Sequence, residues 1–500
     1  MKKNVLFSYI SQVYVALIGI LILPIYLSTL GAEAYGLVGF FTLLQSWFVL
    51  LDLGLSSTIS RETARFKVGA IKPINYLRLF RALSMIFFVI AVVGGGVLYA
   101  LSETISENWL KLDELNTSDV VLCLSIISII VPLRWMCGLF RGVIVGYEKI
   151  VFLSFYIILV STFRFVIVLV VLDLFGENVR VFFIYQLIVA ILEFTGYFAI
   201  SKSIVPNKSE FNEKVGWSIE PIKSILSFSL MIAFTSASWV MITQTDKLIL
   251  SGLLPLQDYA YFSIAVLAAG GILVLSGPIS MSLMPRMTSL YAEGRHQDMY
   301  DIYVSSSQFI SIIAGSATVV LVSLPEQVLF AWSGDHVLSD KAALILSLYT
   351  LGNFFLSLAA FPYYLQYSAG KLKLHFLGNL IFTIILIPLI IMMTKLFGAV
   401  GAAWVWLLAN GFFLGVWTLI VHRVISNGIT LHLRWLRESI ATPMLAPVLF
   451  GAILHYYLSD LLIGRLESTI VVVVSSLITL IISALSCSDI RRKIKKRVFK

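Results

Sequence analysis

Long apolar runs constrain the fold of this chain more than any other feature of its sequence. A helix rises about 1.5 Å per residue, so roughly 20 apolar residues cross the hydrocarbon core of a bilayer. Inside hydrocarbon the backbone must satisfy its own hydrogen bonds, and these runs lack the alternation of barrel strands, so helices are predicted. Fourteen spans are expected: Val5–Leu30, Gly36–Ser60, Leu79–Leu101, Val120–Phe140, Val151–Leu172, Val181–Ile200, Ile225–Leu250, Tyr259–Leu283, Tyr303–Leu324, Ala342–Pro362, Phe376–Met393, Val400–Val421, Ile440–Leu458 and Thr469–Leu485.

The composition agrees with a chain that faces lipid. Hydrophobic residues make up 59% of the 500, charged residues 13%, and the mean hydropathy is +0.95. Soluble domains carry about a quarter charged residues. The three cysteines show neither a CxxC pair nor a Cys/His metal spacing, so we expect no disulfide framework, metal or cofactor. The sequence therefore predicts an all-α integral membrane protein.

Lysine and arginine are distributed unequally between the predicted loops. One side of the membrane receives 28 of them, the other side five, and three lie within spans. Because cytoplasmic loops carry the excess of basic residues, both termini are predicted in the cytoplasm. The net charge of +9 then reflects topology and attraction to anionic lipid headgroups, and nucleic acid binding is not required.

A weak internal repeat divides the spans into two groups of six. The exits of spans one and seven carry Tyr35 and Tyr259, which are 224 residues apart, and the same offset aligns the ends of spans two and eight. An even period gives a parallel repeat, in which transporters bind substrate between two halves. We expect an N-lobe at 1–202, a C-lobe at 223–421, two extra helices at 438–486 and a basic cytoplasmic tail at 487–500.

Two arginines fall deep within predicted spans, where a charge is costly and therefore a functional candidate. Arg134 lies in span four, and Gly138 and Arg141 share its helix face. Arg164 lies near the middle of span five. Cationic stripes on neighbouring helices would line a positive cavity. A structural ion pair, or snorkelling of Arg141 to the interface, is the alternative.

Other charged residues within the spans are compatible with more than one role. Asp52 in span two could titrate, bind a cation or cap the local backbone. Asp246 and Lys247 are adjacent in span seven, so one could face a cavity while the other snorkels. Glu193 in span six is a candidate partner for an arginine.

A cationic cavity suits a phosphorylated lipid headgroup. Such a headgroup cannot cross hydrocarbon unaided, because its charge would lose its hydration. The guanidinium fork matches phosphate oxygens. The cavity could carry a sugar–diphosphate head while the lipid tail stays in the bilayer.

The segment from Ser8 to Ala64 also resembles the start of Wzx-type oligosaccharide flippases of the MOP (multidrug, oligosaccharidyl-lipid, polysaccharide exporter) superfamily. The matching segments are Pro24–Leu27, Leu30–Leu37 and Leu51–Leu55, followed by Arg61; Asp246-Lys247 in span seven stands where that family often shows Asp-Arg.

The resemblance implies the MOP (MATE-like) fold in a bacterial inner membrane and no enzymatic activity. The implied cargo is an undecaprenyl-diphosphate-linked repeat unit of O-antigen, as in lipopolysaccharide biosynthesis, or of a related surface polysaccharide. It would move from the cytoplasmic to the periplasmic leaflet by alternating access, with bending of the first helix near Pro24. Membrane lipids and other polysaccharide-assembly proteins are the implied partners, and coupling to H⁺ or Na⁺ stays open.

Three alternatives remain at the level of the sequence. A MATE-like drug or cation antiporter would share the fold, but two deep arginines disfavour cationic cargo. A lipid II or teichoic-type flippase differs only in cargo. A membrane-embedded glycan polymerase or ligase would need a catalytic constellation on a large outer loop, which the sequence does not show.

Overall fold

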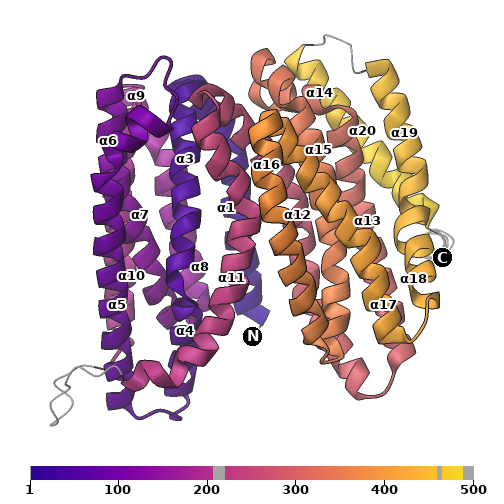
Figure 1. The fold of residues 1–500 in the computed structure, drawn as a ribbon, viewed down its shortest axis with the longest axis horizontal. Coiled ribbons are helices and arrows are strands. Elements are labelled where there is room, and N and C mark those ends of the chain that lie inside the picture. Colours follow the sequence, from indigo (N-terminus) through magenta and orange to yellow (C-terminus); the bar gives the residue numbers. More distant parts are fainter. Residues whose placement is uncertain (1, 207–219, 459–463, 488–500) are drawn as a thin grey trace. The chain divides into compact units, whose positions relative to one another are not determined.

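The computed structural model describes residues 2–206, 220–458 and 464–487. Within these ranges the regular elements are helices, and one isolated bridge joins Lys111 and Pro255. The chain divides into two compact units, residues 1–260 and 261–500 (Figure 1). Most of the predicted tail at 487–500 lies outside the described residues.

The first unit is a bundle of long helices and shorter segments in chain order. They are α1 (Lys2–Leu21), α2 (Leu23–Leu30), α3 (Ala32–Phe48), η1 (Val49–Asp52), α4 (Leu55–Lys67), α5 (Pro73–Ala100), α6 (Ser102–Thr104), η2 (Ile105–Trp109), α7 (Thr117–Gly146), α8 (Ile150–Thr162), η3 (Phe163–Ile167), α9 (Val168–Phe175), α10 (Val179–Lys202) and α11 (Glu220–Leu253). Helix α7 lies at the centre and packs against α3, α4, α5 and α10.

The second unit contains most of α12 and the elements after it. These are α12 (Leu256–Ala292), α13 (His296–Ser323), α14 (Pro325–Ser333), α15 (His336–Ser368), α16 (Leu372–Phe412), η5 (Phe413–Trp417), α17 (Thr418–Ser426), α18 (Thr430–Trp435), η6 (Leu436–Ala441), α19 (Thr442–Leu458) and α20 (Arg465–Ser486). The last two long helices, α19 and α20, pack against each other and against α13.

The number of spans agrees with the sequence prediction of about fourteen. Twelve helical segments of the described residues are long and apolar enough to cross a membrane. One of them, Leu372–Ser426, has 55 residues, or about 80 Å of helix, and Gly398 breaks its backbone with φ 59° and ψ −143°. It therefore corresponds to two expected spans, and α11 contains the expected span Ile225–Leu250.

Helix α11 groups with the first unit. Its span is expected in the C-lobe at 223–421, whereas in the structure α11 packs against α3, α4 and α5. The division into lobes at 202 and 223 stays a prediction.

The expected span Gly36–Ser60 is not one continuous helix. Helix α3 ends at Phe48, a 3₁₀ turn follows, and Leu53 and Gly54 adopt left-handed conformations with φ 48° and 71°. Glycine tolerates this conformation at no steric cost. Asp52 then accepts hydrogen bonds from the backbone N–H and the hydroxyl of Ser56 in the first turn of α4.

The first span is also interrupted. Helix α1 ends at Leu21 and α2 begins at Leu23, so the break at Ile22 comes two residues before Pro24. Proline cannot donate the hydrogen bond that would continue the helix. The position fits the predicted hinge, and bending there stays a prediction.

A buried carboxylate fixes the loop before α7 to the start of α3. Glu33, 5% exposed, accepts hydrogen bonds from the backbone N–H groups of Asp113, Glu114 and Leu115 at 2.8, 2.7 and 2.9 Å. Charge-assisted bonds of this kind are stronger than neutral ones.

The same loop is bound to the end of α11. The Lys111 ammonium donates to the Leu253 carbonyl at 2.6 Å, and the Leu256 N–H donates to the Lys111 carbonyl at 2.9 Å. Helix α3 approaches this point closely at Gly36, where a Cβ atom would lie 2.8 Å from Leu256 Cγ. We call this group of contacts the loop clamp.

Replacing Glu33 by glutamine should loosen the loop clamp. The amide NH₂ cannot accept, so at least one buried N–H would lose its partner, at a cost of about 1–3 kcal/mol. We expect a lower midpoint of thermal unfolding in detergent. The exposed Glu107, replaced by glutamine in the same way, is the control and should leave the midpoint unchanged. Equal midpoints for both variants would show that the clamp contributes nothing to stability.

Candidate functional site

Two adjoining cavities in the first unit contain the predicted arginines. Cavity A has a volume of about 420 Å³ and cavity B about 520 Å³, and both are lined by Val49, Arg134 and Trp135. The other polar residues of cavity A are Tyr26, Thr42, Gln45, Ser46, Arg164 and Gln186; those of cavity B are Asp52, Ser56, Ser57, Ser60, Cys137, Arg141, Glu193 and Tyr197. Volumes of this size suit small ligands or headgroups.

Arg134 projects from the middle of α7 at the junction of the two cavities. Its side chain is 6% exposed, and its Nη2 donates to Gln186 Oε1 at 2.6 Å. The guanidinium also lies over the ring of Phe41, 5.3 Å from the centroid, in a cation–π contact. The side chain is thus held in position from two sides.

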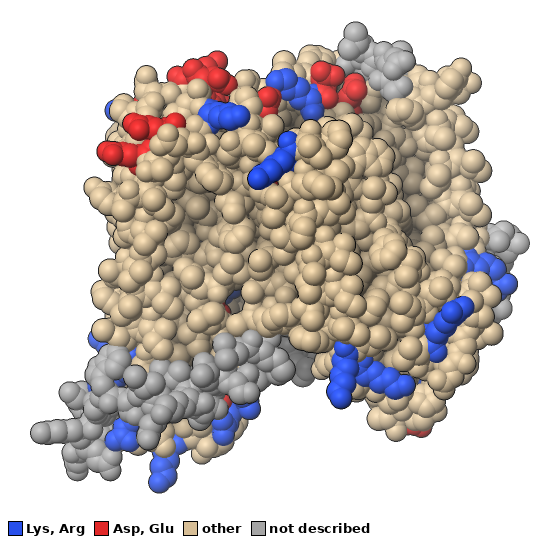
Figure 2. Space-filling model, in the orientation of Figure 1, with Lys and Arg blue, Asp and Glu red and all other residues tan. Residues whose placement is uncertain are grey.

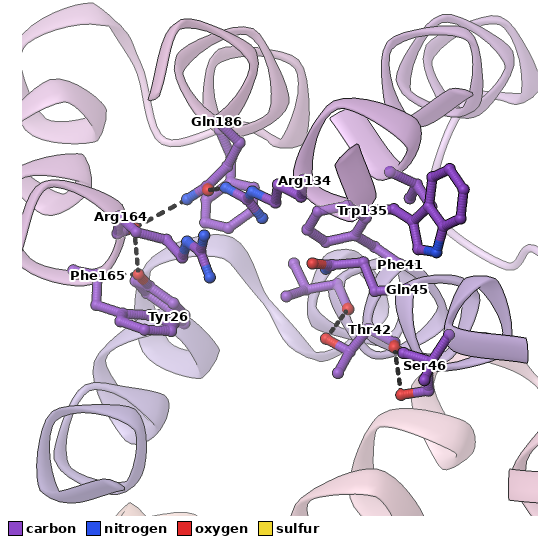
Figure 3. A pocket seen from close by; sticks show the side chains of 14 residues that line it. Tyr26, Phe41, Thr42, Gln45, Ser46, Arg134, Trp135, Arg164, Phe165 and Gln186 are labelled. Atoms are coloured by element: carbon purple, nitrogen blue, oxygen red, sulfur yellow. Dashed lines mark hydrogen bonds between the residues drawn. The ribbon is translucent and has the colours of Figure 1, made fainter. Parts of the chain in front are cut away.

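Arg164 lies in a π-helical segment, η3, which interrupts the helix formed by α8 and α9. Such segments open the regular hydrogen-bond ladder and leave carbonyls available to other donors. The Tyr26 hydroxyl donates to the Phe165 carbonyl at 2.9 Å, and Gln186 Nε2 donates to the Arg164 carbonyl at 2.9 Å. Figure 3 shows Tyr26 and Gln186 around the Arg164 backbone, with the guanidinium turned into the cavity.

Gln186 therefore links the two arginines. Its amide oxygen accepts from the Arg134 side chain while its NH₂ donates to the Arg164 backbone. The side chain is 2% exposed and lies on α10, which packs along α7. A glutamine suits this position because it carries both a donor and an acceptor.

Glu193 lies about two turns beyond Gln186 on α10. Its carboxylate is shared by both arginines. Its Oε2 lies 2.5 Å from Arg164 Nη2 and 3.7 Å from Arg134 Nε. The first is a charge-assisted hydrogen bond, while the second is too long for one. Within the described part of the chain, the Nε atoms of both arginines are buried without a hydrogen-bond partner.

Cavity B continues from this cluster along α7. Arg134, Gly138 and Arg141 all line it, so the predicted shared helix face is present in the structure. Arg141 is exposed to this cavity, and Asp52 lies on the wall formed by η1 and α4. Asp52 is engaged with Ser56, the local backbone cap that the sequence analysis considered.

Asp246 and Lys247 lie outside both cavities. The Lys247 ammonium is 3.3 Å from Asp246 Oδ1 and donates to the Thr243 carbonyl at 2.5 Å. The structure therefore does not bring Lys247 to the Arg134 and Arg164 cluster, and a direct role for it in binding stays a prediction.

Comparison with known proteins identifies the family. A sequence model described as polysaccharide biosynthesis protein matches residues 1–291, more than half of the chain. The chain belongs to this family. A sequence search among curated proteins gives no significant match.

Solved structures show the fold. The lipid II flippase MurJ, in an inward closed conformation, matches with a TM-score of 0.71 at 17% identity, covering 96% of this chain and 98% of MurJ. An inward-facing multidrug resistance MATE transporter of the MOP superfamily matches with 0.66 at 14% identity, covering 81% and 94%. A MOP superfamily transporter from Pyrococcus furiosus matches with 0.54 at 15% identity, covering 85% and 95%. The predicted MOP fold is confirmed.

Among the described residues, no group of three or more His, Cys, Asp or Glu side chains lies close enough to hold a metal ion. Two guanidinium groups with unpaired Nε donors, set among aromatic and hydroxyl side chains, are instead suited to an anion with several oxygens.

Sequence reasoning missed Tyr26, Gln186 and the π-helical segment. Gln186 carried a usable signal, because an amide inside an apolar span needs a partner that cannot be water. The π-helical geometry of residues 163–167 has no comparable signature in the sequence.

Replacing Gln186 by leucine should release the π-helical segment. The Arg164 carbonyl and the Arg134 guanidinium would each lose a hydrogen bond, so we expect amide hydrogen exchange over residues 160–170 to increase about tenfold or more, the effect of losing about 1.4 kcal/mol of local stability.

The control is Tyr156→Phe, which removes the one hydroxyl that donates to the Leu192 and Glu193 carbonyls on α10 and leaves η3 untouched. It should not change exchange over residues 160–170. If Gln186→Leu exchanges like the wild type there, Gln186 does not support the segment.

Proposed function

We propose that this protein is a flippase that moves a lipid-diphosphate-linked oligosaccharide, an O-antigen or related surface polysaccharide unit, across the bacterial inner membrane. The observation that carries the proposal is the pair of guanidinium groups of Arg134 and Arg164 facing cavity A, each with an unpaired Nε donor. Membership of the polysaccharide biosynthesis family and the MOP fold support it.

The two cavities suit chemically different parts of the headgroup. Arg134 at their junction and Arg164 in cavity A suit the diphosphate, because paired forks offer several donors to phosphate oxygens. The hydroxyls of Ser56, Ser57 and Ser60 line cavity B and suit sugar hydroxyls. The polyprenyl tail would stay in the bilayer, so the protein has to enclose only the polar head.

The orientation of the protein in the membrane is inferred from its charge distribution. In the first unit, Figure 2 shows acidic side chains gathered at one end and basic ones at the other. The basic end carries Arg61–Arg81 of α4 and α5, and the acidic end carries the Ser102–Ser118 loop region. The positive-inside rule assigns the basic end to the cytoplasm.

A cysteine introduced at Glu107 should then react with an impermeant maleimide in intact cells, and one at Val68 only after permeabilisation.

Two other functions receive less support. A MATE-like cation antiporter shares the fold, but two buried guanidinium groups would repel a cationic drug. A lipid II flippase uses the same lipid-diphosphate chemistry, and the similarity to MurJ favours it as the second candidate. Alternating access, bending near Pro24 and coupling to H⁺ or Na⁺ are part of the proposal and depend on motions of the whole chain.

Deletion of the gene in its source bacterium tests the function. We expect loss of one surface polysaccharide, with its lipid-linked repeat units accumulating in the cytoplasmic leaflet. Accumulation of a lipid-linked peptidoglycan precursor would favour the second candidate. An unchanged surface glycan and unchanged lipid-linked intermediates would contradict both.

Complementation by Arg164 variants tests the site. Arg164→Ala should reduce polymer export at least tenfold, because a charge-assisted hydrogen bond of about 1.5–3 kcal/mol to the headgroup is lost. Arg164→Lys keeps the charge without the fork and should retain part of the activity.

The matched control is Arg180→Ala, which removes an ion pair with Asp119 at the end of the first unit. It should complement normally. Full export with Arg164→Ala would remove Arg164 from the proposed site.

A further inference from the structure

The cationic cluster contains its own anion. Oε2 of Glu193 occupies the space between Arg164 Nη2 and Arg134 Nε, where an oxygen of a bound phosphate would also find its donors. Carboxylate and phosphate oxygens accept from guanidinium groups in the same geometry. Both ligands therefore use the same donors, and they cannot use them at the same time.

We propose that Glu193 is an exchangeable counter-ion: the phosphate of the lipid-linked substrate binds by displacing the Glu193 carboxylate from Arg164 and Arg134, and the carboxylate returns when the phosphate leaves. This inference rests on the proposed function and deepens it, since it assigns Glu193 a role in binding and release.

The hydrogen bonds of the cluster favour exchange over a permanent ion pair. Glu193 bonds to one nitrogen of Arg164 and only approaches Arg134, which leaves both Nε donors unsatisfied in the described structure. Arg134 is almost fully buried, so this unmet donor is costly. A diphosphate esterified at both ends keeps two free oxygens on each phosphate, and these can satisfy donors on both side chains together.

Charge balance points the same way. Two guanidinium groups and one carboxylate give the cluster a net charge of about +1 in a region of low dielectric, which attracts a further anion. When a diphosphate with two or more negative charges binds, the carboxylate would make the cluster net negative. Its displacement keeps the buried charge close to zero.

A second cation is available to the displaced carboxylate. Arg141 lies two turns beyond Arg134 on α7 and lines cavity B together with Glu193 and Tyr197. Among the described residues, Arg134 and Arg164 have ion-pair partners, whereas the Arg141 side chain has no hydrogen bond or ion pair. Displacement towards Arg141 would therefore leave the Glu193 carboxylate in the same cavity as another positive charge.

The Glu193 carboxylate would affect the rate at which the substrate is released. A site that bound diphosphate with two unopposed arginines would release it slowly, because truncating or breaking buried charge pairs mainly affects dissociation. A carboxylate that competes for the same donors weakens binding and accelerates release. Glu193 would thus lower the affinity for the substrate and raise the rate of turnover.

Binding of farnesyl diphosphate to the purified full-length protein in detergent tests the exchange, with farnesol as the probe that lacks phosphate. Glu193→Gln removes the competing charge but keeps the size of the side chain, so we expect binding about tenfold tighter than in the wild type, equivalent to about 1.4 kcal/mol. Polymer export by the same variant should fall, because release is slower. Glu177→Gln, an exposed loop substitution in the same unit, is the control and should change neither.

A shorter acid provides a second variant in case Glu193→Gln does not fold. Glu193→Asp keeps the charge but withdraws it by one methylene from Arg164, so binding should tighten about threefold, by about 0.65 kcal/mol. Thermal stability of each variant, with and without farnesyl diphosphate, reports folding and binding together.

The outcomes separate the two proposals. Wild-type protein that binds farnesyl diphosphate no better than farnesol would overturn the phosphate site and with it the exchange. Wild-type protein that binds the diphosphate, with both Glu193 variants binding equally or more weakly, would overturn the exchange alone and make Glu193 a structural partner of the arginines.

Discussion

The structure of the proposed site depends on the burial of two permanent positive charges inside a membrane protein. A guanidinium group does not lose its proton in proteins, so Arg134 and Arg164 cannot become neutral to reduce the cost of burial. They must be paired, and Glu193, Gln186 and the ring of Phe41 supply the partners. Each of these side chains lies where it does because two cations need it there.

This requirement also explains local irregularities of the helices. The π-helical segment at 163–167 frees carbonyls, which Tyr26 and Gln186 satisfy, and the same geometry turns Arg164 towards cavity A. The break at Leu53 and Gly54 separates η1 from α4, and residues of both segments line cavity B. Irregular backbone inside a membrane is tolerated where side chains satisfy it or where it lines a cavity, and both conditions hold here.

The sequence predicted the architecture well, because the cost of exposing a polar backbone to lipid leaves little choice of fold. Most predicted span boundaries agree with the helix ends within a few residues. An exception is the expected span Ile440–Leu458, where the helical segment already begins with α18 at Thr430. The arginines and Glu193 could be found from sequence since charges within apolar runs are conspicuous. Their mutual arrangement could not, because it depends on which faces of α7, α10 and η3 meet and on a π-helical turn without a sequence signal. Lys247 illustrates the limit: its position in a helix was predicted, the structure pairs it with its neighbour Asp246, and its role in binding stays a prediction.

The most direct test of this account is an experimental structure of the protein bound to a polyprenyl diphosphate. We predict phosphate density within hydrogen-bond distance, about 3 Å, of the guanidinium groups of both Arg134 and Arg164, with the Glu193 carboxylate withdrawn from Arg164. Density for the diphosphate elsewhere, with Glu193 still bonded to Arg164, would contradict it.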